Sequence, residues 1–348
     1  MNYDFQMNKE KLNGFFDKNY KKLLLIPAVL LIFCFVFMFF FYSQNHDIIK
    51  KDISLTGGTS IQVTSNIDIA TLQSALDTKF KETSVRQVSD ILTGEQVAFI
   101  VETRANTTEI VPFLENYLGF KLTDKNSSIE FTGSTIGEGF YIQLMLAILF
   151  AFIFMGTVVF FIFSDNLKIK LLIVALSLIT PILFFMFNAI SINWAFILSF
   201  IVLAISAYFY IRYSIPGFLV VACAFADLFM TLVTVNLLGM EVSTAGVVAF
   251  IMLIGYSVDT DILLTTRVLK RRGESTNSKI FGSFKTGITM TLTALAIVIV
   301  GFIFTSSFSK VFHQLFTILI IGLIFDILNT WITNACLIKW YAEAKKLD

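Results

Sequence analysis

The chain has 348 residues, of which 56% are hydrophobic and 15% charged, with 39 phenylalanines and a formal net charge of +1. Soluble domains carry roughly 25% charged residues, so the composition excludes a soluble globular protein. The near-neutral charge and the high apolar content also exclude a disordered chain and a basic nucleic-acid-binding protein. The composition predicts a protein of the lipid bilayer.

The charge is unevenly distributed along the chain. Residues 44–139 contain thirteen Asp and Glu against eight Lys and Arg, a net charge of −5, and the remainder contains twelve against eighteen, a net charge of +6. The chain therefore divides into an acidic polar segment and an apolar remainder with basic connections. The three cysteines all lie in apolar runs, which argues against a disulfide framework and against a structural metal site.

Apolar runs predict the membrane-spanning helices, because a span needs about 20 apolar residues. Eight such runs occur, at 23–43, 140–163, 169–188, 194–212, 216–238, 244–266, 286–305 and 314–337. Pro181 and the polar stretch 188–193 interrupt the third and fourth runs. The first run follows Lys18, Lys21 and Lys22 without a small-residue cleavage site after it, so we expect a retained anchor.

Basic residues set the expected orientation, since they concentrate in cytoplasmic connections. With eight crossings, Lys310 is the one basic residue of the connections and termini that falls outside. The others fall on one side of the membrane: five lysines before the first span, Lys168, Lys170, Arg212, Arg267, Lys270, Arg271, Arg272, Lys279, Lys285, Lys339, Lys345 and Lys346. We therefore expect residues 1–22 and 339–348 in the cytoplasm, a span at 23–43, an outer domain at 44–139 and a bundle at 140–338. Removing one hairpin preserves this parity, so the charges fit six spans as well as eight.

The outer segment 44–139 has the pattern of a small α+β domain. Strands are expected at 60–63, 85–92, 96–102 and 128–131, and helices at 68–80 and from Asn106 or Thr107 to about residue 118. The order β-α-β-β-α-β is the ferredoxin-like arrangement. The predicted fold class is thus a polytopic α-helical membrane protein with one extracytoplasmic ferredoxin-like domain.

This outer domain contains no catalytic constellation. His46 is its nearest histidine, and no Ser, Cys or carboxylate pairs with it at a recognisable spacing. Two interpretations remain open: a spacer, or a module that touches a partner or a passing polypeptide. The sequence gives no reason to expect an enzyme, a metal site or a cofactor.

Four carboxylates fall at bilayer depth, where a charge costs about 2.5–3.5 kcal/mol and therefore indicates function. They are Asp227, Asp259, Asp261 and Asp326. On a helix, Asp259 shares a stripe with Tyr256 and Arg267, so Asp259 is the carboxylate expected to sense Arg267. Desolvated carboxylates exchange protons more readily near neutral pH, so the chemistry expected is proton movement. The alternatives are that these groups only hydrogen-bond across helices, as favoured for Asp326, and that Arg267 only sets topology.

The stretch Gly255-Tyr256-Ser257-Val258-Asp259-Thr260-Asp261, continuing as ILLTTRVLKRR, resembles the signature of the SecF family of protein-export membrane subunits in its archaeal form. LTGGTSIQV at 55–63, with Gly57 and Gly58, resembles the family's Gly-Gly motif after the first span. FADLFMTLVTV at 225–235 places Asp227 where the family has an intramembrane aspartate. KTGITMTLTALA at 285–296 and DILNTWITNACLIKWY at 326–341 are similar to the last two spans.

The chain also departs from the family pattern. Bacterial members typically carry Asn-Asp where this chain has Asp259-Thr260, so a residue-level proton mechanism does not carry over intact. The family core has six spans. Residues 136–163 resemble the family's second span, and residues 207–221 resemble the junction that follows that same span. The segment between them, residues 164–212, therefore looks like an added hairpin.

The resemblance implies an auxiliary subunit of the Sec export machinery in the resistance-nodulation-division superfamily. Its expected partners are SecD, the Sec translocon, the translocating polypeptide and membrane lipid, with no nucleic acid, and its site is the cytoplasmic membrane. Two alternatives stay open: a small-molecule exporter of the same superfamily and a passive scaffold subunit. An intramembrane aspartyl protease would need a Gly-x-Gly-Asp motif, which the sequence lacks.

Overall fold

The computed structural model describes residue 14 and residues 16–80, 83–89, 93–190, 193–271, 273–305 and 310–346. Arg272, the first thirteen residues of the predicted cytoplasmic segment, and residues 90–92 at the end of a predicted strand lie outside the described residues.

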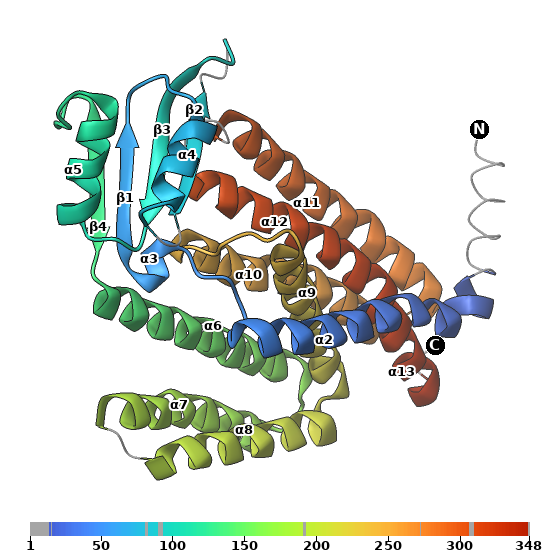
Figure 1. The fold of residues 1–348 in the computed structure, drawn as a ribbon. Coiled ribbons are helices and arrows are strands. Elements are labelled where there is room, and N and C mark those ends of the chain that lie inside the picture. The colour runs from blue at the N-terminus through green and yellow to red at the C-terminus, as the bar shows by residue number, and fades with distance from the viewer. Residues whose placement is uncertain are drawn as a thin grey trace, which may run out of the picture.

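Eight long helices follow the eight apolar runs in order (Figure 1). They are α2 (Leu25–Asn45), α6 (Ser134–Phe163), α7 (Leu167–Ile190), α8 (Asn193–Tyr213), α9 (Ile215–Leu237), α10 (Thr244–Lys270), α11 (Thr276–Thr305) and α12 (Lys310–Leu328). Helices satisfy their backbone polar groups internally, which is why apolar runs of this length adopt them in lipid. Pro181 does not end α7, since proline is tolerated in membrane helices.

The chain is a multi-pass membrane protein. Within the described residues, seven helical segments are long and apolar enough to cross a membrane, and the apolar part of α8, Ile197–Tyr213, is shorter than the rest. An eighth crossing therefore stays a prediction. The last segment runs from α12 through a π-helical turn, η1 (Asn329–Asn334), into α13 (Ala335–Lys345).

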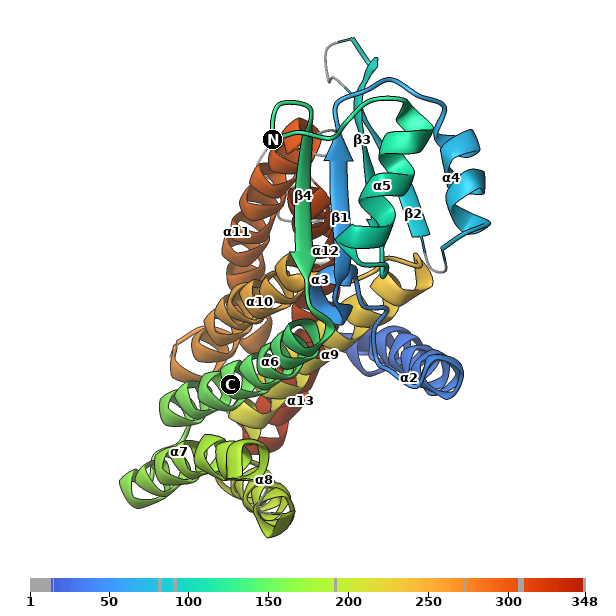
Figure 2. The same cartoon turned by 60° about the vertical axis from the view of Figure 1, so that its left-hand side comes forward.

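Helix α10 lies at the centre of the bundle. It packs against α6, α9, α11 and α12, whereas α2 packs on α9 at one edge. Helices α7 and α8 pack chiefly on each other and lie at the opposite edge, beside α6 and α9 (Figure 2). This arrangement leaves α9, α10 and the α12–η1 segment to enclose the interior of the bundle.

The outer domain is a four-stranded antiparallel sheet with strand order β2-β3-β1-β4. Its strands are β1 (Gly58–Val63), β2 (Thr83–Ser89), β3 (Gln96–Thr103) and β4 (Ser127–Thr132), and its helices are α3 (Ile53–Thr56), α4 (Ile69–Asp77) and α5 (Thr107–Leu118). The Asp68 side chain caps α4 by accepting a hydrogen bond from the Ala70 N–H at 3.1 Å.

The two faces of this sheet differ in character. Ile61 and Phe99 lie on the face that packs on α4 and α5, and both are fully buried there. Residues Ser60 and Glu102 lie on the other face, which borders a cavity of about 360 Å³ also lined by Ser243 at the start of α10. The domain therefore presents its polar face to the end of the bundle at which α10 begins.

Candidate functional site in the membrane bundle

Three of the four predicted intramembrane carboxylates converge in the interior of the bundle. Asp227 on α9, Asp261 on α10 and Asp326 on α12 are all 0% exposed. Each is held by hydroxyl or amide groups from a neighbouring helix. The result is one polar region enclosed by apolar helices.

Asp227 bridges α9 to α10 and to the π-helical turn. The Ser257 hydroxyl donates a short hydrogen bond to its Oδ2 atom. The Asn329 amide donates to its Oδ1 atom at 2.7 Å. Both oxygens of this carboxylate are therefore engaged by neutral donors.

Asp326 is surrounded by three threonines. The hydroxyls of Thr260 and Thr330 lie 3.0 and 3.2 Å from its Oδ1 atom, and the Thr291 hydroxyl lies 3.3 Å from its Oδ2 atom. Thr260 stands one turn beyond Ser257 on α10, and Thr330 follows Asn329 on η1. The surroundings of Asp326 and Asp227 are thus connected through adjacent side chains on two segments.

Asp261 completes the group one turn further along the bundle. The Asn334 amide donates to its Oδ1 atom at 2.7 Å, and its buried Oδ2 atom has no hydrogen-bond partner. Asn329 and Asn334 begin and end the π-helical turn, so this turn supplies an amide to each of two carboxylates. Single π-helical turns occur frequently at functional sites.

The donors at all three carboxylates are neutral. Among the described residues, no lysine or arginine forms an ion pair with Asp227, Asp261 or Asp326. A buried anion without a counter-cation is very unfavourable, whereas a protonated carboxyl can donate a hydrogen bond to a neighbouring oxygen. The arrangement is therefore suited to holding protons.

Asp259 does not join this group, and among the described residues it forms no ion pair with Arg267, which it was expected to sense. Asp259 is exposed on the outer face of α10. The Arg267 guanidinium instead donates to the Gly282 carbonyl on α11 at 2.6 Å. Both residues lie on α10, but Asp259 faces away from the bundle, whereas the long Arg267 side chain reaches α11.

The glycines and the tyrosine of the two sequence motifs differ in how closely other atoms surround them. A Cβ on Gly58, whose φ is +150°, would lie 2.5 Å from the Thr103 carbonyl oxygen, so this position needs glycine for close approach to β3. The Gly57 N–H lies close to Gly137 at the start of α6. Gly255 has no atom near its Cβ position, and Tyr256 is 39% exposed beside it. Of Gly255, Tyr256 and Ser257, Ser257 is the residue that reaches a buried carboxylate.

Sequence reasoning left out the neutral members of the network. Thr260, Thr291 and Thr330 are almost fully buried, and the two amides of η1 are 0% exposed. The rule that polar groups at bilayer depth need partners applies to amides and hydroxyls as well as to charges. Applied to the last apolar run, it would have selected Asn329, Thr330 and Asn334.

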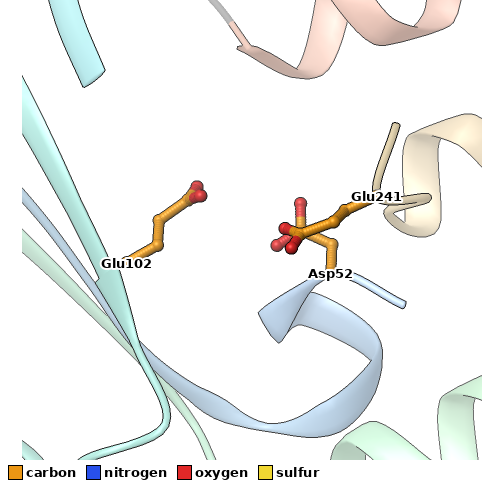
Figure 3. A group of neighbouring side chains, drawn as sticks. All are labelled: Asp52, Glu102 and Glu241. Atoms are coloured by element: carbon orange, nitrogen blue, oxygen red, sulfur yellow. The ribbon is translucent and has the colours of Figure 1, made fainter. Parts of the chain in front are cut away.

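A second acidic group lies where the outer domain meets the bundle, and the sequence did not predict it. Carboxylate oxygens of Asp52, Glu102 and Glu241 lie within 4.8 Å of one another, with Glu102 projecting from β3 toward the other two (Figure 3). Asp52 also accepts a hydrogen bond from the Ile53 N–H, and Arg86 pairs with Glu102 at 3.0 Å. Beside this group, backbone hydrogen bonds between Val242 and residues 50 and 52 tie the outer domain to the loop before α10.

Asp47 supports the same junction from the end of α2. Lys51 lies 2.5 Å from its Oδ2 atom, and the Tyr141 hydroxyl on α6 donates to its Oδ1 atom at 2.7 Å. Burial raises the pKa of Asp47, but hydrogen bonds from Lys51, Tyr141 and the Ile48 N–H outweigh burial and hold that pKa below its ordinary value. The ionised form of Asp47 is therefore favoured by the folded structure.

Comparisons with known proteins place the chain in a family. The family described as protein export membrane protein SecD/SecF, C-terminal, matches residues 186–344. A protein-export membrane protein SecF from Methanocaldococcus jannaschii is 30% identical over 340 residues, which cover 95% of this chain and 99% of that protein. The chain belongs to the SecD/SecF family. A SecF from Methanothermobacter thermautotrophicus is 28% identical and covers 94% of both chains.

A solved structure shares the fold. The crystal structure of SecDF, a translocon-associated membrane protein from Thermus thermophilus, superposes with a TM-score of 0.57 at 16% identity. The match covers 94% of this chain but 38% of the SecDF chain. The matched SecD/SecF family segment contains every buried carboxylate and amide of the network, from Asp227 to Asn334.

Proposed function

We propose that the chain is a SecF-type subunit of the Sec protein-export machinery in the cytoplasmic membrane, where it acts with SecD to promote translocation or release of exported polypeptides. The observation that carries this proposal is the similarity over 99% of a protein named SecF. The fold shared with SecDF supports it. The orientation with both termini in the cytoplasm, and the ferredoxin-like outer domain, are parts of the same proposal.

The buried carboxylates are the proposed coupling element. Protonation of Asp227 or Asp326 gives the carboxyl one O–H donor, which lets its hydrogen bond with a neighbouring hydroxyl, of Ser257 or Thr260 respectively, reverse direction. Because Ser257 and Thr260 lie on α10 while Asn329 and Thr330 lie on η1, such a change acts on the contact between these two segments. A proton gradient can thereby bias the packing of the bundle beneath the outer domain.

The exposed face of α10 is the proposed contact with SecD. Val248, Met252 and Tyr256 are between 39% and 43% exposed, and Gly255 and Asp259 are exposed on the same side. An aspartate facing lipid at this depth costs about 2.5–3.5 kcal/mol, so a polar partner that covers Asp259 is strongly favoured. The match covers 38% of the SecDF chain, so most of that chain has no counterpart here. Its unmatched part supports a second membrane half as the partner that covers this face.

Affinity purification from native membranes tests the assignment of this face. Gly255→Trp adds a large side chain where the chain itself leaves open space, so we expect it to reduce co-purified SecD at least ten-fold without lowering the protein level. Ile297→Trp, on the 68% exposed face of α11, is the matched control and retains SecD. Absence of SecD from the wild-type preparation would contradict the proposed function, and equal recovery with Gly255→Trp would contradict only the assigned face.

The outer domain is proposed to touch the exported polypeptide along β4. This strand is at the edge of the sheet, and Ile129 and Phe131 on it are 42% and 53% exposed. An open strand edge with alternating apolar side chains suits an extended polypeptide. We expect a photo-crosslinker at Phe131 to capture a stalled export substrate, and one at Glu109 on α5 not to do so.

A further inference from the structure

A carbon-lined cavity separates the α7–α8 hairpin from the rest of the bundle. It has a volume of about 240 Å³ and lies between α6, α7, α8 and α9. Four hydroxyl residues border it, but each donates to a carbonyl of its own helix at 2.8–2.9 Å; they are Thr157, Ser177, Thr180 and Ser206. Cavities lined by apolar groups do not hold water. The remaining hydroxyl, of Tyr210, packs against Gly156.

Basic side chains surround the end of this cavity where the helices connect. Lys168 and Lys170 lie in the first turn of α7, and Arg212 lies in the last turn of α8. Lys170 is three residues, about one turn, from the cavity-lining Ile173 and shares its side of α7, whereas Arg212 lies about 3 Å along α8 from the cavity-lining Tyr210 and on the exposed side of that helix. Lys270 of α10 joins them, since its ammonium group donates to the Ile162 carbonyl at 3.4 Å.

The charge at this corner is mainly positive and accessible. Lys168 and Arg212 are exposed, and the Lys170 ammonium group lies 4.6 Å from the centre of the exposed Phe161 ring of α6. Asp165 is the acidic residue of the same α6–α7 connection. An apolar cavity with several cations at the adjoining end of the hairpin matches the two parts of an anionic phospholipid.

We propose that the α7–α8 hairpin and the bundle form a binding site for one anionic phospholipid. Its headgroup phosphate lies among Lys168, Lys170 and Arg212, and part of an acyl chain fills the cavity between the four helices. Because α7 packs more on α8 than on α6, the lipid supplies contacts that join the hairpin to the bundle. The hairpin thereby acquires a role that does not depend on the proposed export function.

Native mass spectrometry of the purified full chain tests the site. The probes are palmitoyl-oleoyl phosphatidylglycerol and palmitoyl-oleoyl phosphatidylcholine, added in equal amounts to protein in a mild detergent. We expect one phosphatidylglycerol to stay bound at concentrations where phosphatidylcholine does not. Lys168→Gln and Lys170→Gln should each weaken retention about five-fold, the effect of one charge near a membrane surface.

Filling the cavity provides the second arm. Leu203→Trp and Ser206→Leu place added volume in it, and we expect both to lose the bound lipid. Ile205→Trp, on the 41% exposed outer face of the same helix, is the matched control and keeps it. Thermal unfolding identifies folded variants, and Ser206→Leu carries the test if Leu203→Trp does not fold. Equal binding of the two lipids, lipid retention by the filled cavity, or equal loss in the control would overturn the proposal.

Discussion

At the residue scale, each buried carboxylate depends on a neutral donor from another segment. Asn334 is the donor to Asp261, whose second oxygen has no partner. Removing one member of such a pair leaves a desolvated polar group, which costs more than the hydrogen bond itself contributes. The pairs therefore specify how η1 docks on α10.

A double-mutant cycle measures that dependence. Asn334→Leu should lower the free energy of unfolding in detergent by about 1–3 kcal/mol, because it leaves Asp261 without its amide. Asp261→Leu combined with Asn334→Leu should cost less than the sum of the single changes, since no polar group is then left unpaired. Thr289→Val, at an exposed position of α11, is the control. Additive effects of the two changes would contradict the pairing.

Asp47 gives a prediction about pH. Its folded-state pKa lies below the ordinary value of 3.8, so its ionised form stabilises the junction above that value, and the stabilisation is lost as pH falls through the lowered pKa. We expect the difference in melting temperature between wild type and Asp47→Asn to be largest near neutral pH and to shrink below about pH 4. A difference that stays constant down to pH 3 would show that Asp47 does not act through its charge.

Sequence reasoning at this scale could find the carboxylates but not which of them meet. Residues 259 and 261 are about 200° apart around a helix, so both cannot face the same interior. Which one does depends on the rotation of α10, and that rotation is fixed by packing against α9, α11 and α12. The pairing of Arg267 with Gly282 has the same origin and carries no local signal in the sequence.

At the element scale, close packing of η1 on α11 is what positions the two asparagines. A Cβ on Gly287 would lie 2.3 Å from the Trp331 ring, so the ring lies directly against the α11 backbone. Trp331 is in the middle of the π-helical turn that contains Asn329 and Asn334. The contact therefore links the distance between α11 and η1 to the positions of Asn329 and Asn334 in the carboxylate network.

Replacing this glycine tests the coupling. Gly287→Ala should destabilise the isolated chain by about 1–3 kcal/mol, the usual cost of overpacking. Gly255→Ala is a matched helical control with no atom within 4 Å, and we expect a much smaller loss of stability from it. Equal melting temperatures for the two variants would contradict the close contact.

The elements themselves were largely predictable, and their irregularities were not. Every apolar run contains a helix, and the alternating and amphipathic patterns of 60–118 correspond to strands and helices in the same order. The π-helical turn has no sequence signature, because it arises from inserting one residue into a turn under tertiary packing. Pro181 predicted an interruption that the lipid-compatible helix α7 absorbs.

At the scale of the whole molecule, the outer domain sits over the outer ends of α9 and α10 through a few specific links. Val242 exchanges backbone hydrogen bonds with residues 50 and 52, at 2.6 and 3.0 Å. The Asn236 amide donates to the Ile48 carbonyl at 2.8 Å. A change in the packing of α10 can reach the domain along these links, which the sequence could not reveal because their members are 188 or more residues apart.

Topology is a prediction of the whole molecule as well. If α7 and α8 both cross the membrane, a cysteine introduced at Asn193, the first residue of α8, reacts with a membrane-impermeant maleimide added outside intact cells. A cysteine introduced at Asp165 is expected not to react, because the proposed orientation places that connection in the cytoplasm. The native cysteines Cys34, Cys223 and Cys336 are buried and give little background. Labelling of position 165 from outside would show that the orientation is the opposite of the proposed one.

Gradient-dependent export is the measurement that tests the central claim most directly. Export of a secreted reporter is compared with and without a proton gradient in cells carrying wild type, Asp227→Asn, Asp326→Asn, or the control Asp165→Asn in the exposed α6–α7 connection. We expect the two buried changes, at normal protein levels and with SecD still bound, to remove the stimulation by the gradient, whereas Asp165→Asn leaves it unchanged. Full gradient stimulation in both buried variants would contradict the proposed role of the carboxylate network.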